Sequence, residues 1–369
     1  MQYITIANQG VKSLSPYQAG KPIEELEREL GISNIVKLAS NENPFGFPDS
    51  AKQAIINQLE NLTRYPDANG FELKQAIAKK FGVQPNQITL GNGSNDLLEL
   101  FAHTFAGERD EIIYSQYAFI VYPLVTKAIN AIAKEVPAKN WGHHLAGFLT
   151  ALSDKTKLIF IANPNNPTGN FLTEQEIDDF LAKVPEKVIV VLDEAYTEFT
   201  LPEERLDSFG LLKKYPNLIV SRSLSKAYGL AGLRIGYAVS NPEIADLLNR
   251  VRQPFNCNSL ALASAIAVMN DDTFIEKVAE NNRVEMARYE QFCHQYGLDY
   301  IPSKGNFITI DFKQPAQPIY EALLRKGVIV RPIAGYGMPN HLRISIGLPQ
   351  ENDKFFTALI QVLNLTQTD

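Results

Sequence analysis

The segment SRSLSKAYGLAGLRIGY, residues 221–237, combines hydroxyl groups, a lysine and an arginine in a glycine-containing loop. Ser223 and Ser225 are two positions apart, so in an extended segment their side chains point the same way. These hydroxyls and the forked guanidinium of Arg234 can together hold a phosphate dianion. Lys226 would then lie at the other end of the same ligand, where a desolvated amine can form a Schiff base. The simpler interpretation is a polar surface loop with two solvated cations.

Other polar residues also follow apolar runs directly. Asp193 follows VIVVL, and a carboxylate at the end of a buried strand needs a partner. That partner is a helix N-terminus, a neighbouring cation or a protonated ring nitrogen of a ligand. Asn166, between the prolines of NPNNPTG, belongs to a rigid turn or is an amide held toward a ligand oxygen. Ser94 and Asn95 in GNGSND open an expected helix, whose free N–H groups bind phosphate or belong to an ordinary capped turn.

These residues follow a series of short β-rich segments, namely QITL, EIIYS, KLIFIA, KVIVVL and NLIVS. Such nearly continuous apolar runs are typical of strands that are covered on both faces in a parallel sheet. Helical patterns lie between them, and LTEQEIDDFLAKV places Thr173 and Glu176 at the spacing of a capping box. Alternating strands and helices predict a doubly wound α/β domain. Because ligands bind beyond the carboxyl ends of parallel strands, we expect the polar residues above to form one site.

The alternation predicts a large α/β domain over residues 45–255. Residues 1–44 and 256–369 are expected to form an N-terminal arm and a smaller α+β domain. In that part DTFIEKVAENNRVEMARYEQFCHQYG is typical of one long amphipathic helix, while NFITIDF, VIVRPI and HLRISIG are typical of strands. The pattern of the arm leaves open whether it packs on the smaller domain.

The composition excludes several classes of protein. The 369 residues are 45% hydrophobic and 21% charged, as in ordinary globular proteins, and a net charge of −6 disfavours nucleic acid as a partner. Two cysteines, Cys257 and Cys293, indicate a reducing compartment rather than a disulfide framework. The sequence shows neither a signal-peptide pattern nor an apolar run long enough for a membrane helix, so we expect a cytoplasmic protein without membrane contact. The five histidines lack the spacing of metal ligands, and no metal site is expected.

The stretch SLSKAYGLAGLRIGY resembles the lysine motif of fold-type I aminotransferases that depend on pyridoxal 5′-phosphate. NPNNPTG and DEAY resemble two further motifs of that superfamily in the same order, and SPYQAGKP, NENPFG and RYPD are similar to those of the histidinol-phosphate aminotransferase family. The resemblance covers nearly the whole chain. It implies a mostly parallel sheet flanked by helices in a large cofactor-binding domain, beside a smaller α+β domain. It also implies the cofactor pyridoxal 5′-phosphate and a homodimer with shared active sites.

The resemblance further implies a role for each matching residue. Lys226 would be the catalytic residue, which bonds to the cofactor and moves the proton between the substrate Cα and the cofactor C4′. Asp193 would pair with the protonated pyridine nitrogen, while Asn166 and Tyr196 would hydrogen-bond the phenolic oxygen of the ring. The remaining cofactor contacts implied are stacking by Tyr117 and phosphate binding by Ser94, Asn95, Ser223, Ser225, Arg234 and, from the neighbouring subunit, Tyr65.

For the substrate, Arg331 and Arg343 match two arginines that grip the phosphate of histidinol phosphate, helped by Tyr17. Packing for Tyr17 and a surface ion pair for Arg331 are the simpler alternatives. The segment PIAGYGMPNHL between the arginines contains two prolines and two glycines, which predict that the chain turns back and brings both arginines to one ligand. Gln116 departs from the proline that the family carries before its stacking aromatic, a change that removes no chemical group.

The implied reaction interconverts histidinol phosphate and 2-oxoglutarate with imidazole acetol phosphate and glutamate, a step of histidine biosynthesis. Two alternatives share the fold and many of the motifs. One is an aromatic amino acid aminotransferase, and the other is a pyridoxal-phosphate-dependent decarboxylase of phosphorylated amino acids.

Overall fold

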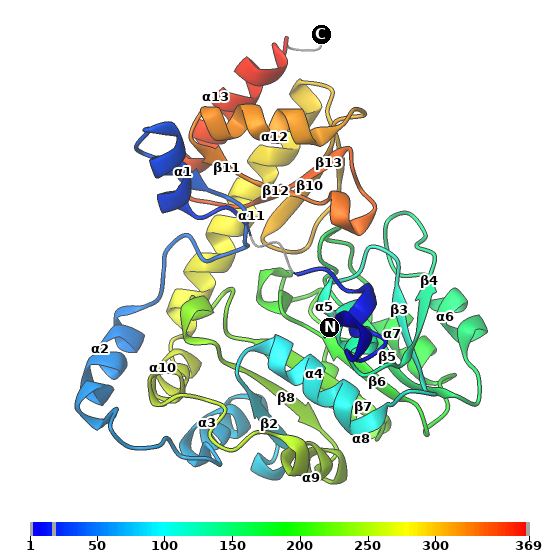
Figure 1. Cartoon of the computed structure of the whole chain (residues 1–369). Helices are drawn as coiled ribbons and strands as arrows, with labels where there is room; N and C mark the ends of the chain where they lie inside the picture. Colours follow the sequence, from blue (N-terminus) through cyan, green and yellow to red (C-terminus); the bar gives the residue numbers. More distant parts are fainter. Residues whose placement is uncertain (1–2, 17–19, 367–369) are drawn as a thin grey trace.

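The structure, a computed structural model, describes residues 3–16 and 20–366. Figure 1 shows a larger body built on one wide sheet and a smaller body above it, which contains the C-terminal part of the chain. A single long helix, α11 (Asp272–Gln295), runs between the two.

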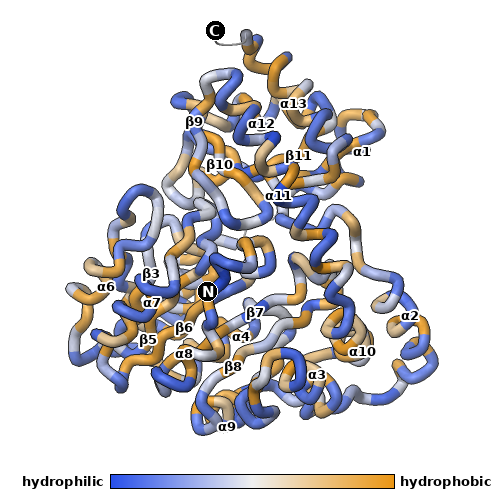
Figure 2. Tube along the Cα trace, turned by 180° about the vertical axis from the view of Figure 1, so that it is seen from behind, coloured by the Kyte–Doolittle hydropathy of each residue, from blue (hydrophilic) through white to orange (hydrophobic). Residues whose placement is uncertain are grey.

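The sheet of the larger body has seven strands in the order β2-β8-β7-β6-β5-β3-β4. Strand β8 runs opposite to the other six strands of this sheet, which confirms the expected mostly parallel sheet. The five predicted apolar runs form β2, β3, β5, β6 and β7, whereas β4 and β8 were not predicted. The central β5 and β6 are largely hydrophobic and buried (Figure 2). The strands are β2 (Ile88–Gly91), β3 (Glu111–Ser115), β4 (Ile132–Val136), β5 (Thr156–Ala162), β6 (Ile189–Asp193), β7 (Leu218–Ser223) and β8 (Gly236–Ser240).

Helices pack on both faces of this sheet. They are α2 (Asp49–Gln58), α3 (Phe71–Phe81), α4 (Ser94–Phe105), α5 (Val121–Ala128), α6 (Leu145–Ala151), α7 (Glu174–Leu181), α8 (Ser208–Lys214), α9 (Pro242–Val251) and α10 (Ser259–Met269). The predicted capping box begins α7, because Thr173 Oγ1 accepts from the Glu176 N–H at 3.3 Å and Glu176 Oε2 accepts from the Thr173 N–H at 2.8 Å. None of the helices that the structure describes is long and apolar enough to cross a membrane.

The smaller body has an antiparallel sheet in the order β12-β13-β10-β9 and a two-stranded sheet of β1 and β11. Pairing of β1 with β11 places the later part of the N-terminal segment on this body, a point that the sequence left open. The first described residues lie instead beside α5 of the larger body, where the Ala128 carbonyl accepts from Asn8 Nδ2 at 3.2 Å and Asn130 Oδ1 accepts from the Gly10 N–H at 2.6 Å. The strands and remaining helices of the smaller body are β1 (Val36–Lys37), β9 (Asp299–Ile301), β10 (Phe307–Asp311), β11 (Val328–Ile329), β12 (Arg331–Pro332), β13 (His341–Ser345), α1 (Ile23–Leu30), α12 (Ala316–Arg325) and α13 (Pro349–Leu363).

The long helix α11 contributes to the apolar cores of both bodies. Val278 belongs to the core around β2 and β8, whereas Met286 and Phe292 belong to the core of the smaller body. Helix α10, which follows the predicted domain boundary at residue 255, packs against α2 and α3 of the larger body. The division into domains at residues 45 and 255 stays a prediction.

A buried amide joins α11 to α13 in the smaller body. Asn352 Oδ1 accepts hydrogen bonds from the Tyr289 hydroxyl and from the Gly347 N–H, both at 3.0 Å. Its Nδ2 donates to Glu285 Oε2 at 2.8 Å. The side chain is fully buried, so water cannot replace these partners.

Replacing Asn352 with Ala should therefore destabilise the fold, because it leaves buried donors and acceptors unpaired. We expect a loss of about 2 kcal/mol or more in the free energy of unfolding. Thermal unfolding followed by circular dichroism measures the effect, with Gln361→Ala at an exposed position of the same helix as the control. Equal unfolding temperatures for the two variants would contradict this role of Asn352.

Candidate active site

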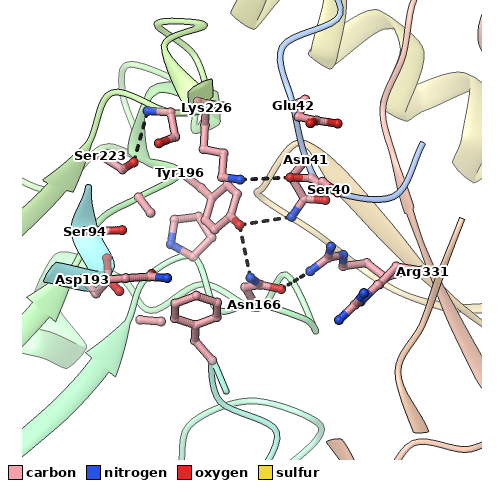
Figure 3. Close-up of a pocket in the computed structure, with 18 of the residues that line it drawn as sticks. Ser40, Asn41, Glu42, Ser94, Asn166, Asp193, Tyr196, Ser223, Lys226 and Arg331 are labelled. Carbon is pink, nitrogen blue, oxygen red and sulfur yellow. Dashed lines mark hydrogen bonds between the residues drawn. The ribbon is translucent and has the colours of Figure 1, made fainter. Parts of the chain in front are cut away.

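A cavity of about 270 Å³ lies where the carboxyl ends of β6 and β7 face the start of α4 and the strands β12 and β13. Figure 3 shows side chains from both bodies converging on it. The structure thus brings together most of the residues that the sequence singled out. Those that line the cavity are Ser94, Asn95, Asn166, Asp193, Tyr196, Ser223, Ser225, Lys226, Arg234, Arg331 and Arg343.

Lys226 lies just beyond the end of β7 and points into the cavity (Figure 3). Its Nζ donates a hydrogen bond to the carbonyl oxygen of Ser40 at 3.0 Å. Burial, followed by the positive charges of Arg343 and Arg234, lowers the pKa of the amine to about 8, while Glu42 acts in the opposite direction. A lowered pKa increases the uncharged fraction at neutral pH, which is the form that attacks a carbonyl carbon.

Asp193 ends β6 at the deep side of the cavity and is buried. Its Oδ2 accepts a hydrogen bond from the Tyr122 hydroxyl at 2.8 Å, whereas its buried Oδ1 has no hydrogen-bond partner among the described residues. Burial raises the pKa of this carboxyl to about 6, against the opposite influence of the Tyr122 hydrogen bond. The arrangement suits a ligand group that brings its own proton and positive charge.

Groups suited to an anion gather at the end of the cavity formed by α4 and β7. Ser94 opens α4, whose first N–H groups have no partner within the helix. Ser223 Oγ accepts from the Ser225 N–H at 3.1 Å, and Arg234 Nη1 donates to Ser225 Oγ at 3.3 Å. Gly93 precedes Ser94 with φ +85°, and a Cβ atom there would lie 2.4 Å from Arg234 Nη2. Only glycine therefore lets the guanidinium reach the start of the helix.

The hydroxyl of Tyr196 is the centre of a polar network on the opposite wall. It accepts hydrogen bonds from Asn41 Nδ2 at 3.1 Å and from Asn166 Nδ2 at 3.2 Å (Figure 3). Burial raises the pKa of Tyr196 to about 12, so the hydroxyl keeps its proton at neutral pH and can donate it to a ligand oxygen.

Arg331 and Arg343 are direct partners across β12 and β13, and both line the cavity. The chain between them turns back as the sequence predicted. Arg343 is buried and donates to Asn166 Oδ1 at 2.5 Å and to the Ala39 carbonyl at 2.7 Å. Like charges directly opposite each other destabilise a sheet, so an anion bound between these two side chains would reduce the repulsion between them.

Three predicted residues are not part of this assembly. Tyr117 has φ +57° and packs against Trp141 with ring centres 5.1 Å apart, while Phe119 lines the cavity instead. Tyr65 lies outside the cavity of its own chain, is 83% exposed and stacks on Phe255 with ring centres 4.7 Å apart. Tyr17 lies outside the described residues.

Sequence reasoning also missed Asn41, Phe119 and Tyr122. YAFIVY offers aromatics at three positions. Of these, Tyr117 has a left-handed conformation and packs on Trp141, whereas Phe119 lines the cavity. Tyr122 lies in the first turn of α5, and its ring meets the ring of Phe119, which precedes the helix, edge to face with ring centres 5.9 Å apart. Asn41 belongs to the quoted NENPFG motif, but its partners are distant in sequence and gave no local signal.

Comparison with known proteins agrees with this geometry. The model of the family Aminotransferase class I and II matches residues 33–359. The chain is 88% identical to histidinol-phosphate aminotransferase 2 of Haemophilus influenzae, with 98% of this chain and 99% of that protein covered. It is 78% identical to histidinol-phosphate aminotransferase 1 of Mannheimia succiniciproducens, with 99% and 100% covered.

Among solved structures, the fold is similar to the histidinol-phosphate aminotransferase of Sinorhizobium meliloti in complex with pyridoxal-5′-phosphate. The TM-score is 0.89 at 29% sequence identity, and 97% of each chain is covered. With a family match over most of the chain and a relative 88% identical over 98% of it, the protein belongs to the class I and II aminotransferases, in the group of the histidinol-phosphate aminotransferases.

Proposed function

We propose that this enzyme interconverts histidinol phosphate and 2-oxoglutarate with imidazole acetol phosphate and glutamate, as a step of histidine biosynthesis. The observation that carries the proposal is the pair Arg331 and Arg343, held opposite each other on the cavity wall that faces Lys226. A phosphate ester carries two negative charges and three free oxygens. It is therefore a better ligand for two guanidinium groups than a single carboxylate is. The names of the relatives support the same substrate.

The residues of the cavity fit pyridoxal 5′-phosphate. Asp193 Oδ1 is a buried acceptor without a partner among the described residues, and it suits the protonated nitrogen of the pyridine ring. Ser94, Asn95, Ser223, Ser225 and Arg234 form the cradle for the phosphate, where Gly93 leaves the room that a side chain would fill. When bound, this cofactor withdraws electrons from the substrate Cα, which makes the proton there removable.

The residues of the chain then have distinct tasks. The Lys226 amine, with its lowered pKa, would accept the proton from the substrate Cα and deliver it to the cofactor C4′. Asp193 keeps the ring nitrogen protonated by its charge. Tyr196, oriented by Asn166 and Asn41, donates toward the phenolic oxygen of the ring. Phe119, rather than Tyr117, lines the cavity and would cover one face of the ring.

Two neighbouring activities remain as second candidates. An aromatic amino acid aminotransferase would use one of the two arginines for a substrate carboxylate, and the other would then have no phosphate to bind. A decarboxylase of phosphorylated amino acids would keep the phosphate contacts but release carbon dioxide. Purified protein incubated with glutamate and imidazole acetol phosphate, phenylpyruvate or 4-hydroxyphenylpyruvate separates these activities by their products.

We further propose that the active form is a homodimer in the cytoplasm. Tyr65 is 83% exposed and Phe255, on which it stacks, is 42% exposed, so this aromatic pair presents apolar surface that a second copy can cover. In such a dimer the Tyr65 hydroxyl would reach the cofactor phosphate of the neighbouring subunit.

Replacing Asp193 with Asn tests the partner of the ring nitrogen, since it keeps the shape and removes the charge. We expect kcat to fall about a hundred- to a thousandfold, as when a preorganised electrostatic partner is lost. Asp154→Asn, which makes the same change at a fully exposed position, should leave kcat unchanged. A loss of less than about tenfold would indicate that Asp193 merely satisfies local backbone groups.

Replacing Arg331 with Ala tests how the substrate phosphate is bound. We expect kcat/KM for histidinol phosphate to fall about ten- to a hundredfold, and kcat/KM for phenylalanine to change much less. Arg325→Ala, at an exposed position of α12, is the control. Equal losses of kcat/KM for both substrates in Arg331→Ala would favour an aromatic amino acid aminotransferase over the proposed function.

Mixed dimers test the role of Tyr65 across the interface. Subunits with Lys226→Ala and subunits with Tyr65→Ala should each have little activity alone. Mixing them creates dimers with one intact site, so activity should return once subunit exchange is shown by a tag on one of the two. Exchange without any recovery would place Tyr65 in the site of its own subunit or outside both sites.

A further inference from the structure

The backbone beside the cavity is held in an unusual conformation at Asn41. This residue is 1% exposed and has φ +55°, which few residues other than glycine adopt. Its N–H donates to Ser345 Oγ at 2.8 Å, its Oδ1 accepts from the same hydroxyl at 2.9 Å, and its Nδ2 donates to Tyr196. A conformation that is fixed by several partners at an active site usually serves to aim a neighbouring group.

The residue two positions further along is fixed as well. Asn43 Nδ2 donates to the carbonyl oxygen of Ala227, the residue after Lys226, at 2.8 Å, and its Oδ1 accepts from the Phe45 N–H at 3.0 Å. Glu42 therefore lies between two anchored residues, one tied to β13 and the other to the loop of the catalytic lysine. This places the start of its side chain on the cavity wall before any ligand binds.

Glu42 has the chemistry for a positively charged or N–H-bearing group. Of the described residues that line the cavity, Glu42 and Asp193 are those with carboxylates, and Asp193 lies at the deep end. Figure 3 shows Glu42 above Asn41, across the cavity from the backbone of Lys226, and Arg331 lower on the same side as Glu42. The Glu42 carboxylate is half exposed and pairs with Lys37 at 3.2 Å, an exposed contact that costs little to exchange for another donor.

Histidinol phosphate carries two arms on the carbon that reacts. One arm ends in phosphate, which the arginines bind in the function proposed above, and the other ends in imidazole, a ring with N–H donors and a pKa of about 6.5 in solution. We infer that Glu42 accepts a hydrogen bond from the imidazole of the substrate and so selects imidazole over a phenyl ring. This inference rests on the proposed function, and it assigns the arm of the substrate that the arginines do not bind.

The test compares histidinol phosphate with phenylalaninol phosphate, which keeps the amine and the phosphate but replaces imidazole by phenyl. The wild-type protein should prefer histidinol phosphate in kcat/KM, and Glu42→Gln should lower kcat/KM for histidinol phosphate about tenfold while leaving the phenyl compound unchanged. Lys37→Gln removes the partner of Glu42 without removing the carboxylate, and it should retain the preference of the wild type.

The outcomes separate this inference from the proposed function. Wild-type turnover of neither phosphate would overturn both. If the wild type turns over both phosphates and Glu42→Gln loses activity equally on both, the proposed function stands but the contact with imidazole is overturned. Glu42 would then act on the charge of the Lys226 amine, and the pH profile of kcat would shift to lower pH. An unchanged preference in Glu42→Gln would likewise overturn the contact with imidazole.

Discussion

The buried carboxylate of Asp193 is the constraint around which the larger body is organised. One of its oxygens is satisfied by Tyr122, which is itself fully buried and stacked on Phe160 with ring centres 4.7 Å apart. The other oxygen is buried as well and has no hydrogen-bond partner among the described residues. Removing a charge from water without a partner is costly. A ligand that supplies a proton and a positive charge would therefore stabilise the Asp193 carboxylate at the end of β6.

The raised pKa of Asp193 links this site to stability. Its folded-state value of about 6 lies above the ordinary value of 3.8, so the folded protein without ligand binds a proton more tightly than the unfolded chain does. Above pH 3.8 the contribution of this group to stability therefore falls as the pH rises, and the fall is complete once the pH passes about 6. A cationic ring held against the carboxylate reverses that penalty, so ligand binding and folding support each other at neutral pH.

The sequence predicted most of the strands and the polar loops that follow them, because these depend on local patterns such as apolar runs and turn residues. It did not predict β1, β4, β8 or β9. It also predicted that the chain between Arg331 and Arg343 turns back, although the register that makes them direct partners comes from the pairing of β12 with β13. It could not show that Tyr117 takes a positive φ and leaves the cavity to Phe119. The position of Asn41 was equally hidden, since it depends on Ser345 and on other contacts that are distant in sequence.

Helix α11 has a consequence for how the molecule can be divided. At 24 residues it is about 36 Å long, and it carries side chains of both apolar cores on one rigid rod. A fragment that ended before α11 would lose Val278 from the core of the larger body, and one that ended after it would expose the apolar face that now covers β10 and α13. Neither body is therefore an independent module, and recombination of this enzyme with a relative would have to exchange the helix together with everything that packs on it.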